Sequence, residues 1–246
     1  MKTILLLAII VSTTALELPS NFKTCKRSDP KLSECVANAS KNVTLMLAKG
    51  LKSFKILPLE PLAVDSIKIG ESEDSVSLKQ EYWNIKVHGL TKDGDKLRVF
   101  NYKIDWDKLI FSWETFNSQV DFVADYKLSG RILILSLQGE GKCNISMHDL
   151  RTTHVAYFEK FERDGEIYMR TKKYIVKFFP KHVDLQFNNL FSGDQILGDQ
   201  IQKFLRDNSE IIFKELQGPF EEAFGFVFAK ITNDIFTRVP LNKLFK

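Results

Sequence analysis

Apolar residues recur at steps of three and four near the C-terminal end of the chain, from about Asp194 to about Val239. This spacing places them on one wide face of a helix and predicts that most of that helix is buried. Asp194 provides an N-cap, Gly218-Pro219 predicts a bend or a restart, and Pro240 ends the helix. The stripe consists of Ile196, Leu197, Ile201, Phe204, Leu205, Ile211, Ile212, Leu216, Phe220, Phe224, Val227, Phe228, Ile231 and Ile235.

A membrane span is the alternative interpretation of so apolar a helix. Its most apolar stretch, Ala223 to Ala229, is far shorter than the roughly 20 residues that a bilayer crossing needs. We therefore predict a helix that lies in the core of the protein.

The region before this helix alternates between apolar and polar positions, which predicts strands. Asp93-Gly94 and Asp164-Gly165 are hairpin signals, while Gly130 and Gly139-x-Gly141 suggest a bend or a bulge. Residues 132–135 are apolar on both faces, so the strand that contains them is expected to be covered on both sides, on one of them by the long helix. The predicted strands cover residues 76–85, 97–102, 109–113, 119–128, 131–137, 155–162, 166–173 and 174–179.

Strands followed by one long apolar helix predict an α+β fold. The other face of the strand that contains residues 132–135 is covered either by further protein or by a bound apolar ligand. Aromatic residues are dense nearby, although each belongs more often to a core than to the wall of a cavity. Tyr126 would also offer a hydroxyl group to a ligand. The candidate ligand-binding residues, selected from the apolar pattern, are Trp83, Trp113, Tyr126, Leu133, Leu135, Phe204 and Phe224.

The first 15 residues have the features of an export signal. Lys2 precedes an apolar run, Ile4 to Val11, and the small residues Thr13-Thr14-Ala15 form a cleavage site. The run is too short for a signal anchor. We predict a signal peptide over residues 1–15 and an extracellular protein over residues 16–246, which forms either one extended domain or two fused halves. The net charge of +4 is too small and too scattered to predict a nucleic-acid partner.

Export also affects how the cysteines are interpreted. An oxidising compartment favours a disulfide between Cys25 and Cys35. Cys143 is then left over, and a buried, inert thiol is a more common role for it than an intermolecular bridge or a reactive group.

Glycosylation sequons begin at Asn38, Asn42 and Asn144. Residues 33–49 predict a helix with Val36, Ala39, Val43 and Leu47 on one face, and Asn38 and Asn42 fall on the opposite face. Glycans on these two asparagines would therefore not disturb the packing of the helix.

An enzyme that acts on lipids, such as an esterase, is one competing class of function. It would need a nucleophile with its base, but the sequence contains neither Gly-x-Ser-x-Gly nor His-Glu-x-x-His. His148 and His154 could share a strand face near Asp149 and bind a metal, although exposed or structurally bonded histidines are far more common. We therefore predict no enzyme, no cofactor and no metal site.

A module that binds membranes or other proteins, with a purely structural core, is another alternative. It would use basic residues such as Lys172-Lys173, Lys243 and Lys246 on an anionic surface. Solvated surface charges are the more common meaning of such residues.

Several short segments, by their order and spacing, resemble the insect takeout and juvenile-hormone-binding protein family over nearly the whole of residues 16–246. The N-terminal cysteine pair of the family matches Cys25 and Cys35. Members of the hormone-binding branch have a second disulfide, which Cys143 alone cannot form, so the chain is closer to the takeout-like members. The matching segments are Leu18-Pro19, Asp29-Pro30, residues 58–62, residues 125–130, Gly139-x-Gly141, residues 189–194, Leu197-Gly198, residues 239–241 and Leu244-Phe245.

This resemblance implies a highly curved antiparallel sheet wrapped around a long C-terminal helix, as in one module of the tubular lipid-binding proteins. It implies a secreted carrier with a small hydrophobic ligand, isoprenoid, juvenile-hormone-like or fatty-acid-like, in an internal tunnel. Several family members are associated with circadian rhythm, feeding or chemosensation. We expect a monomer that can contact a membrane but does not need one to function.

Overall fold

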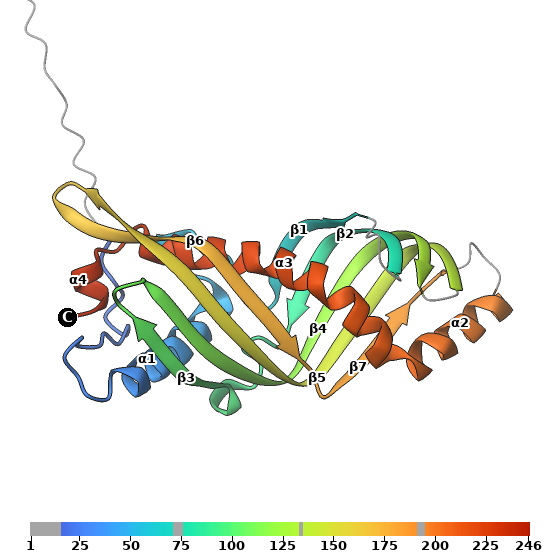
Figure 1. Ribbon diagram of the computed structural model, residues 1–246, viewed down its shortest axis with the longest axis horizontal. Helices are drawn as coiled ribbons and strands as arrows, with labels where there is room; N and C mark the ends of the chain where they lie inside the picture. The colour runs from blue at the N-terminus through green and yellow to red at the C-terminus, as the bar shows by residue number, and fades with distance from the viewer. Residues whose placement is uncertain (1–15, 71–75, 133–134, 191–194) are drawn as a thin grey trace, which may run out of the picture.

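The computed structural model describes residues 16–70, 76–132, 135–190 and 195–246. In these residues a strongly curved antiparallel sheet wraps around a long helix (Figure 1), and the predicted α+β fold is confirmed. The predicted signal peptide, residues 1–15, lies outside the described residues. The strands are β1 (Leu62–Ile69), β2 (Val76–His88), β3 (Arg98–Asp105), β4 (Ile110–Ile132), β5 (Leu135–Arg163), β6 (Glu166–Phe179) and β7 (His182–Phe187), and the helices are α1 (Leu32–Met46), α2 (Gln195–Asp207), α3 (Ser209–Phe236) and α4 (Leu241–Leu244).

Two very long strands form the middle of the sheet. β4 pairs with β5 in one register along the whole length of β4, from Ile110 opposite Tyr157 to Ile132 opposite Leu135. β2 and β3 pair with separate stretches of β4, and β6 and β7 pair with separate stretches of β5. The β4–β5 hairpin therefore connects the two ends of the molecule, with α1 and β3 at one end and α2 at the other (Figure 1).

Asparagine residues bend the sheet at two β-bulges. Asn84 in β2 and Asn101 in β3 both have a φ of 53°, in the left-handed region that asparagine tolerates well. The register of each strand against β4 shifts at that point. The Asn84 amide donates to Asp125 at 2.6 Å, and the Asn101 amide donates to Glu114 at 2.9 Å, both on β4. Because a bulge bends its strand, these positions help to curl the sheet around α3.

The long helix predicted from the apolar stripe is divided into α2 and α3 at Asn208. The backbone N–H and the side-chain amide of Asn208 both donate to the Phe204 carbonyl, at 3.1 and 2.8 Å. Asparagine side chains compete with helical hydrogen bonds in this way. The restart predicted at Gly218-Pro219 is wrong, since α3 continues through Pro219 and ends at Phe236. The bend predicted there stays a prediction. The N-cap predicted at Asp194 lies outside the described residues.

Several strand boundaries also differ from the predicted ones. Segments 109–113 and 119–128 are parts of β4, segments 166–173 and 174–179 are parts of β6, and β1 and β7 were not predicted. The strand predicted over residues 131–137 is wrong, because Ile132 at the end of β4 pairs with Leu135 at the start of β5. The chain therefore reverses there instead of continuing as one doubly covered strand.

The two hairpin signals have different outcomes. Asp164-Gly165 connects β5 to β6, which pair up to the turn, so this prediction is confirmed. Asp93-Gly94 instead leads through a 3₁₀ turn, Gly94–Lys96, from β2 to β3. Within the described sheet these two strands pair with β4 and not with each other.

The glycines of Gly139-x-Gly141 mark a close approach of two backbones rather than a bend or bulge. A Cβ atom at Gly139 would lie 2.8 Å from the carbonyl oxygen of Asn189, and one at Gly141 would lie 2.5 Å from that of Asn188. β5 stays in register with β4 through both glycines. The missing side chains therefore let the segment after β7 cross β5.

Side chains of α2 and α3 hydrogen-bond to backbone groups of β6 and β7. On β7, Gln202 accepts from the N–H of Phe187 at 3.1 Å and donates to the carbonyl of Leu185 at 2.5 Å. On β6, Asn233 accepts from the N–H of Thr171 at 2.7 Å. Because edge strands otherwise offer their backbone to other chains, these side chains both attach the helices and protect the edge.

Glu221 forms the most extensive of these contacts. Its carboxylate accepts hydrogen bonds from the N–H of Phe178 at 2.9 Å, from Gln217 at 2.6 Å and from Lys177 at 2.5 Å. Gln217 also donates to the Phe178 carbonyl at 2.8 Å. One turn of α3 therefore satisfies both polar groups of the Phe178 backbone.

A pair of glycine substitutions tests how closely α3 lies on the sheet. A Cβ atom at Gly225 would be 2.7 Å from the Tyr174 carbonyl oxygen, whereas one at Gly198 in α2 would meet nothing within 4 Å. We expect Gly225→Ala to reduce the free energy of unfolding by about 1–3 kcal/mol through overpacking. Gly198→Ala should raise it by about 0.5–1 kcal/mol, the ordinary helical gain. Urea denaturation of both variants measures this, and equal effects would contradict the close approach.

Candidate functional site

Open space lies between the concave face of the sheet and the helices, and most of it is at one end of the molecule. Cavity 1, of about 270 Å³, lies at the end formed by α1, α4 and the C-terminal half of α3. Cavity 2, of about 60 Å³, lies near the middle, and cavity 3, of about 10 Å³, lies towards α2. Cavities 1 and 2 adjoin each other, because they share the lining residues Leu90, Thr115, Asn117, His154 and Phe228.

Helices α1 and α3 supply the apolar walls of cavity 1. The apolar face predicted for residues 33–49 belongs to α1 and the 3₁₀ turn after it, Leu47–Lys49, so this helix is confirmed. Residues on opposite sides of the cavity thus come from helices that are far apart in the sequence. The helical residues of this wall are Val36, Ala39, Val43, Leu47, Phe228, Ile231, Ile235 and Phe236.

The two terminal segments of the described chain meet at the outer end of cavity 1. The N–H of Arg27 donates to the carbonyl of Lys246 at 2.7 Å, and the N–H of Lys246 donates to the carbonyl of Cys25 at 3.0 Å. The disulfide between Cys25 and Cys35 is present and joins this segment to α1. The residues of these segments that line the cavity include Leu18, Phe22, Leu244 and Phe245.

Three rings from three neighbouring strands stack along the sheet side of cavity 1. Tyr102 of β3 stacks on Trp113 of β4, with ring centres 5.3 Å apart and planes 7° apart. Trp113 stacks in turn on His154 of β5, at 5.0 Å and 8°. Tyr174 of β6 meets both Trp113 and His154 edge to face. The result is a continuous stack of aromatic rings along this side of the cavity.

His154 is the polar centre of this wall. Its Nδ1 lies 3.0 Å from the Tyr174 hydroxyl, and its Nε2 lies 3.3 Å from the Thr115 hydroxyl. Burial lowers the pKa of His154 to about 3, because the charged imidazolium cannot be solvated there. The imidazole is therefore neutral at physiological pH. Burial also raises the pKa of Tyr174 and of Tyr102, so both hydroxyls stay protonated.

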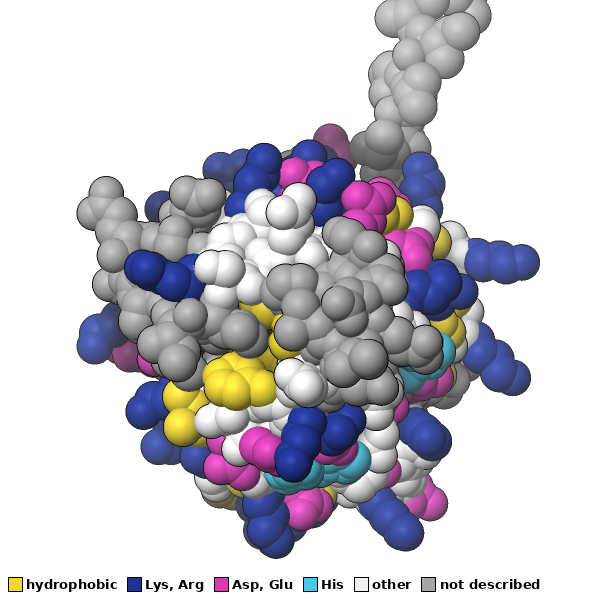
Figure 2. All heavy atoms as spheres, turned by 90° about the vertical axis from the view of Figure 1, so that its right-hand side faces the viewer, with side chains coloured by type: hydrophobic (Ala, Val, Ile, Leu, Met, Phe, Trp, Pro, Cys, Tyr) yellow, Lys and Arg dark blue, Asp and Glu magenta, His cyan; other side chains and the backbone are white. Residues whose placement is uncertain are grey.

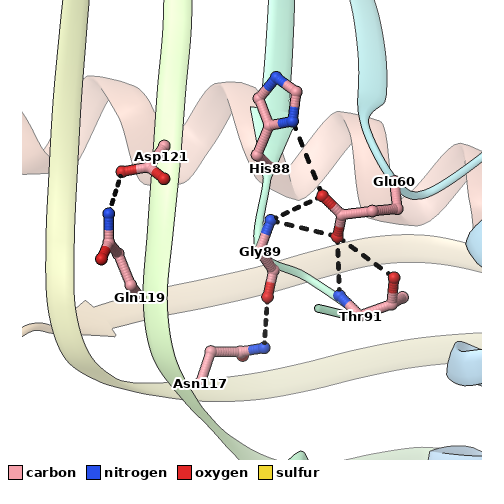
Figure 3. A network of polar contacts seen from close by, with 7 residues as sticks. All are labelled: Glu60, His88, Gly89, Thr91, Asn117, Gln119 and Asp121. Atoms are coloured by element: carbon pink, nitrogen blue, oxygen red, sulfur yellow. Dashed lines mark hydrogen bonds and ion pairs between the residues drawn. The ribbon is translucent and has the colours of Figure 1, made fainter. Parts of the chain in front are cut away.

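Glu60 holds the loop that contains Leu90, a residue that lines both cavity 1 and cavity 2. Figure 3 shows the polar contacts of this loop. The Glu60 carboxylate accepts hydrogen bonds from the N–H groups of Gly89 and Thr91, at 2.9 and 3.1 Å, and from the Thr91 hydroxyl at 3.2 Å. From the other side, the Asn117 amide donates to the carbonyls of Gly89 and Leu90, at 3.1 and 3.2 Å. This network fixes the Leu90 side chain where it lines both cavities.

Aromatic packing separates cavity 2 from cavity 3. Tyr82, Phe122 and Phe220 are in mutual contact, with ring centres 5.3 to 5.4 Å apart. The Tyr82 hydroxyl donates to Gln80 at 2.8 Å, which holds the ring in place. Cavities 1 and 2 form the larger chamber, and the internal tunnel implied by the family resemblance stays a prediction.

Two of the predicted ligand-binding residues lie on these cavities. Trp113 lines cavity 1, and Phe224 lines cavity 2. Trp83 is half-buried on β2, and Phe204 packs against the main core, and neither lines any of the three cavities. Tyr126 is fully buried, and its hydroxyl donates to the Asn188 carbonyl at 2.6 Å instead of facing open space.

The remaining two predicted wall residues cannot be placed on a cavity. Leu133 lies outside the described residues, and only the backbone of Leu135, at the start of β5, is described. The residues that suggested them do not form one strand, because Ile132 at the end of β4 pairs with Leu135 at the start of β5.

The sequence-based selection missed several residues of the chamber. Thr115, His154 and Tyr174 are polar, and the selection rested on apolar pattern alone. One signal was available for His154, which alternates in step with Ala156 and Phe158 on what proves to be the buried face of β5. The α1 residues were assigned only to packing, although they also form one wall of cavity 1.

The third cysteine and the sequons lie away from cavity 1. Cys143 is free and buried, and burial raises its pKa to about 12, which keeps the thiol protonated at neutral pH. Asn38 is exposed and Asn42 is half-buried, both on α1. Asn144 lies in β5 between β4 and β7, and its Oδ1 is buried without a hydrogen-bond partner. Glycosylation of the three asparagines stays a prediction.

Charged side chains of both signs are interspersed over the end of the molecule near α2, around a small exposed apolar patch (Figure 2).

His148 does not share a site with the buried His154. It contacts Asp184 at 2.9 Å, and His182 contacts the same carboxylate at 3.1 Å. Among the described residues, no group of three histidine, cysteine or acidic side chains is arranged to hold a metal ion. The helices of the described ranges also lack the combination of length and apolar character that a membrane crossing needs.

Residues 4–246 match the family model described as haemolymph juvenile hormone binding protein (JHBP). The chain belongs to the JHBP family. The resemblance noted from the short segments is therefore confirmed over almost the whole sequence.

Similar JHBP-family relatives include two proteins named circadian clock-controlled protein daywake. Those of Drosophila melanogaster and Drosophila yakuba are each 24% identical to this chain, and the alignments cover 93% of this chain and 88% of each relative. The crystal structure of Epiphyas postvittana Takeout 1 superposes with a TM-score of 0.78 at 23% identity, covering 91% of this chain and 99% of that one. At such low identity the superposition establishes a shared fold.

Proposed function

We propose that this protein is a secreted, monomeric carrier that binds a small hydrophobic molecule in the chamber formed by cavities 1 and 2. The observation that carries this proposal is a largely apolar cavity of about 270 Å³ inside the fold. That volume is close to the lower end of the roughly 300–1,000 Å³ typical of ligand pockets. Membership of the JHBP family, in which hydrophobic ligands are typical, supports the same function.

The physical driving force is removal of hydrocarbon from water. Burial of roughly 200–400 Å² of apolar ligand surface at about 25 cal/mol/Å² amounts to about 5–10 kcal/mol before association costs. Micromolar or tighter binding is therefore within reach without covalent chemistry. An isoprenoid or a fatty-acid-like chain has the required apolar surface.

Export is supported by the N-terminal sequence and by the Cys25–Cys35 disulfide, a bond that persists in oxidising compartments. We propose cleavage after Ala15 and a circulating domain that begins at Leu16. Similarity to the daywake proteins also makes a circadian role a reasonable physiological hypothesis.

Ligand extraction tests the carrier proposal. The protein is secreted from insect cells, purified without detergent, extracted with organic solvent and analysed by mass spectrometry. We expect an apolar molecule to co-purify, and the emptied protein to bind one equivalent of the apolar fluorophore N-phenyl-1-naphthylamine at micromolar concentration. N-terminal sequencing should give Leu16. A protein that retains nothing apolar and leaves the fluorophore in water would contradict the proposal.

A further inference from the structure

A chain of hydrogen bonds crosses the sheet where cavities 1 and 2 meet. Thr115 of β4, His154 of β5 and Tyr174 of β6 are linked through the two ring nitrogens of the histidine, at 3.3 and 3.0 Å. Thr115 and His154 line both cavities, and Tyr174 lines cavity 1. These are polar groups in a chamber whose other walls are mostly apolar.

The number of protons in this chain leaves one donor unused. Each hydroxyl has one proton, and a neutral imidazole has one more. If Nδ1 holds the ring proton, it donates to Tyr174, Thr115 donates to Nε2, and the Tyr174 O–H is left over. If Nε2 holds it, the Thr115 O–H is left over. The described part of the chain provides neither hydroxyl with another partner.

A donor that faces a mostly apolar chamber without a protein partner is favourable for binding, because an acceptor atom on a ligand can satisfy it. The tautomer of His154 decides which hydroxyl, that of Thr115 or that of Tyr174, has the unused proton. The ring can therefore adjust to the position of the acceptor atom. An acceptor atom, supplied by water or by a ligand, therefore completes the site.

The same surroundings disfavour an anionic ligand group. His154 is neutral, and burial of a carboxylate without a cationic partner is strongly unfavourable. Among the described residues that line cavities 1 and 2, the basic residue is Lys23, an exposed side chain on the N-terminal segment. The acceptor that suits the junction is therefore uncharged.

The unequal volumes of the two cavities also constrain the shape of the ligand. If the acceptor atom lies at the junction, most of the ligand lies in cavity 1, of about 270 Å³, and a short end of it lies in cavity 2, of about 60 Å³. Cavity 2 therefore accepts only a short end of the ligand. The oxygen would thus lie near one end of the ligand but not at it.

We propose that Thr115, His154 and Tyr174 bind an uncharged oxygen acceptor, such as a carbonyl or ether oxygen, close to one end of an otherwise apolar ligand. This inference rests on the proposed function, because it assigns the polarity of the ligand in the same chamber. It makes the three residues a specificity site and distinguishes the ligand from a plain hydrocarbon and from a carboxylate.

Competition against N-phenyl-1-naphthylamine tests the proposal with three twelve-carbon probes: dodecane, 3-dodecanone and dodecanoate at pH 8. One additional neutral hydrogen bond should make 3-dodecanone bind about threefold to tenfold more tightly than dodecane. Dodecanoate should bind most weakly. If dodecanoate binds as tightly as the ketone and Lys23→Gln abolishes that binding, the ligand is an anion held at the cavity mouth and the proposal is overturned.

A triple variant, Thr115→Val/His154→Phe/Tyr174→Phe, removes the polar groups and keeps similar shapes. We expect it to bind dodecane as before and to lose the preference for the ketone, while Tyr168→Phe, a buried tyrosine of β6 away from the cavities, keeps that preference. Tyr174→Phe alone should keep most of it, because Thr115 or the ring still supplies a donor. A triple variant that retains the full preference would overturn the proposal.

Nitrogen-15 NMR of the His154 ring in the unmodified protein provides a measurement that needs no variant. Binding of 3-dodecanone should shift the two ring nitrogens towards one tautomer, and dodecane should leave the tautomer ratio unchanged. Identical spectra with both probes would overturn the proposal. If even dodecane fails to bind, the carrier function itself is wrong, whereas equal binding of dodecane and ketone refutes only the assignment of the polar site.

Discussion

Replacement of Glu221 by alanine should lower the free energy of unfolding by about 2–4 kcal/mol, because it leaves a buried backbone N–H without a partner. Glu221 is 4% exposed on α3, and its carboxylate accepts from the N–H of Phe178 at 2.9 Å. Lys177 contributes less to this figure, since its side chain is 53% exposed and water can replace the lost partner.

The neighbouring residue Glu222 is a matched control, because it has the same charge on the same helix but is exposed. Glu222→Ala should change the free energy of unfolding by less than about 0.5 kcal/mol. Glu221→Gln retains an acceptor for the Phe178 N–H and should fall between the two alanine variants. Urea denaturation, followed by tryptophan fluorescence, measures all three. Equal stabilities of the two alanine variants would show that this contact does not hold α3 to β6.

The Glu221 contact also connects stability to the chamber. Phe220 and Phe224, on the same stretch of α3, line cavity 2. Glu221 and Gln217 fix that stretch to the Phe178 backbone, and so determine how far these rings reach towards the sheet. A variant that loosens this contact should therefore weaken ligand binding as well as stability.

The fold was largely accessible from sequence, because its main elements have strong periodic patterns. The apolar stripe of α2 and α3 and the amphipathic spacing of α1 predicted helices in the right places, and the family resemblance added the curved sheet. What the stripe could not predict is the break at Asn208, since one side-chain hydrogen bond decides it locally. The bulges at Asn84 and Asn101 likewise depend on acidic partners on another strand.

The candidate site was less accessible, because an apolar pattern identifies buried residues without identifying those that border open space. Trp113 and Tyr126 are both aromatic residues of β4, yet Trp113 lines cavity 1 and Tyr126 is enclosed. The difference arises from Asn188, whose carbonyl accepts from Tyr126 across 62 residues. His154 was interpreted as an exposed or structural histidine, and only the stack with Trp113 reveals its place in the chamber.

A tryptophan that fills cavity 1 should abolish ligand binding and leave the protein folded. Ala39 on α1 is half-buried and lines the cavity, so the indole of Ala39→Trp would occupy much of its volume of about 270 Å³. We expect the affinity for N-phenyl-1-naphthylamine to fall by about 100-fold or more, equivalent to about 2.7 kcal/mol. The new ring replaces empty space with van der Waals contacts, so stability should be retained or increased.

Ser33→Trp is the matched control, because Ser33 is exposed on the same helix and does not line the cavity. It should bind the fluorophore as the unmodified protein does. Val43→Phe is a smaller change in the same wall and should give an intermediate loss of affinity for the fluorophore. It keeps the prediction testable if Ala39→Trp misfolds through overpacking. If Ala39→Trp has unchanged stability and unchanged affinity, the ligand does not occupy cavity 1. The carrier proposal would then lose its site, because cavities 2 and 3, of about 60 and 10 Å³, are too small to hold the ligand.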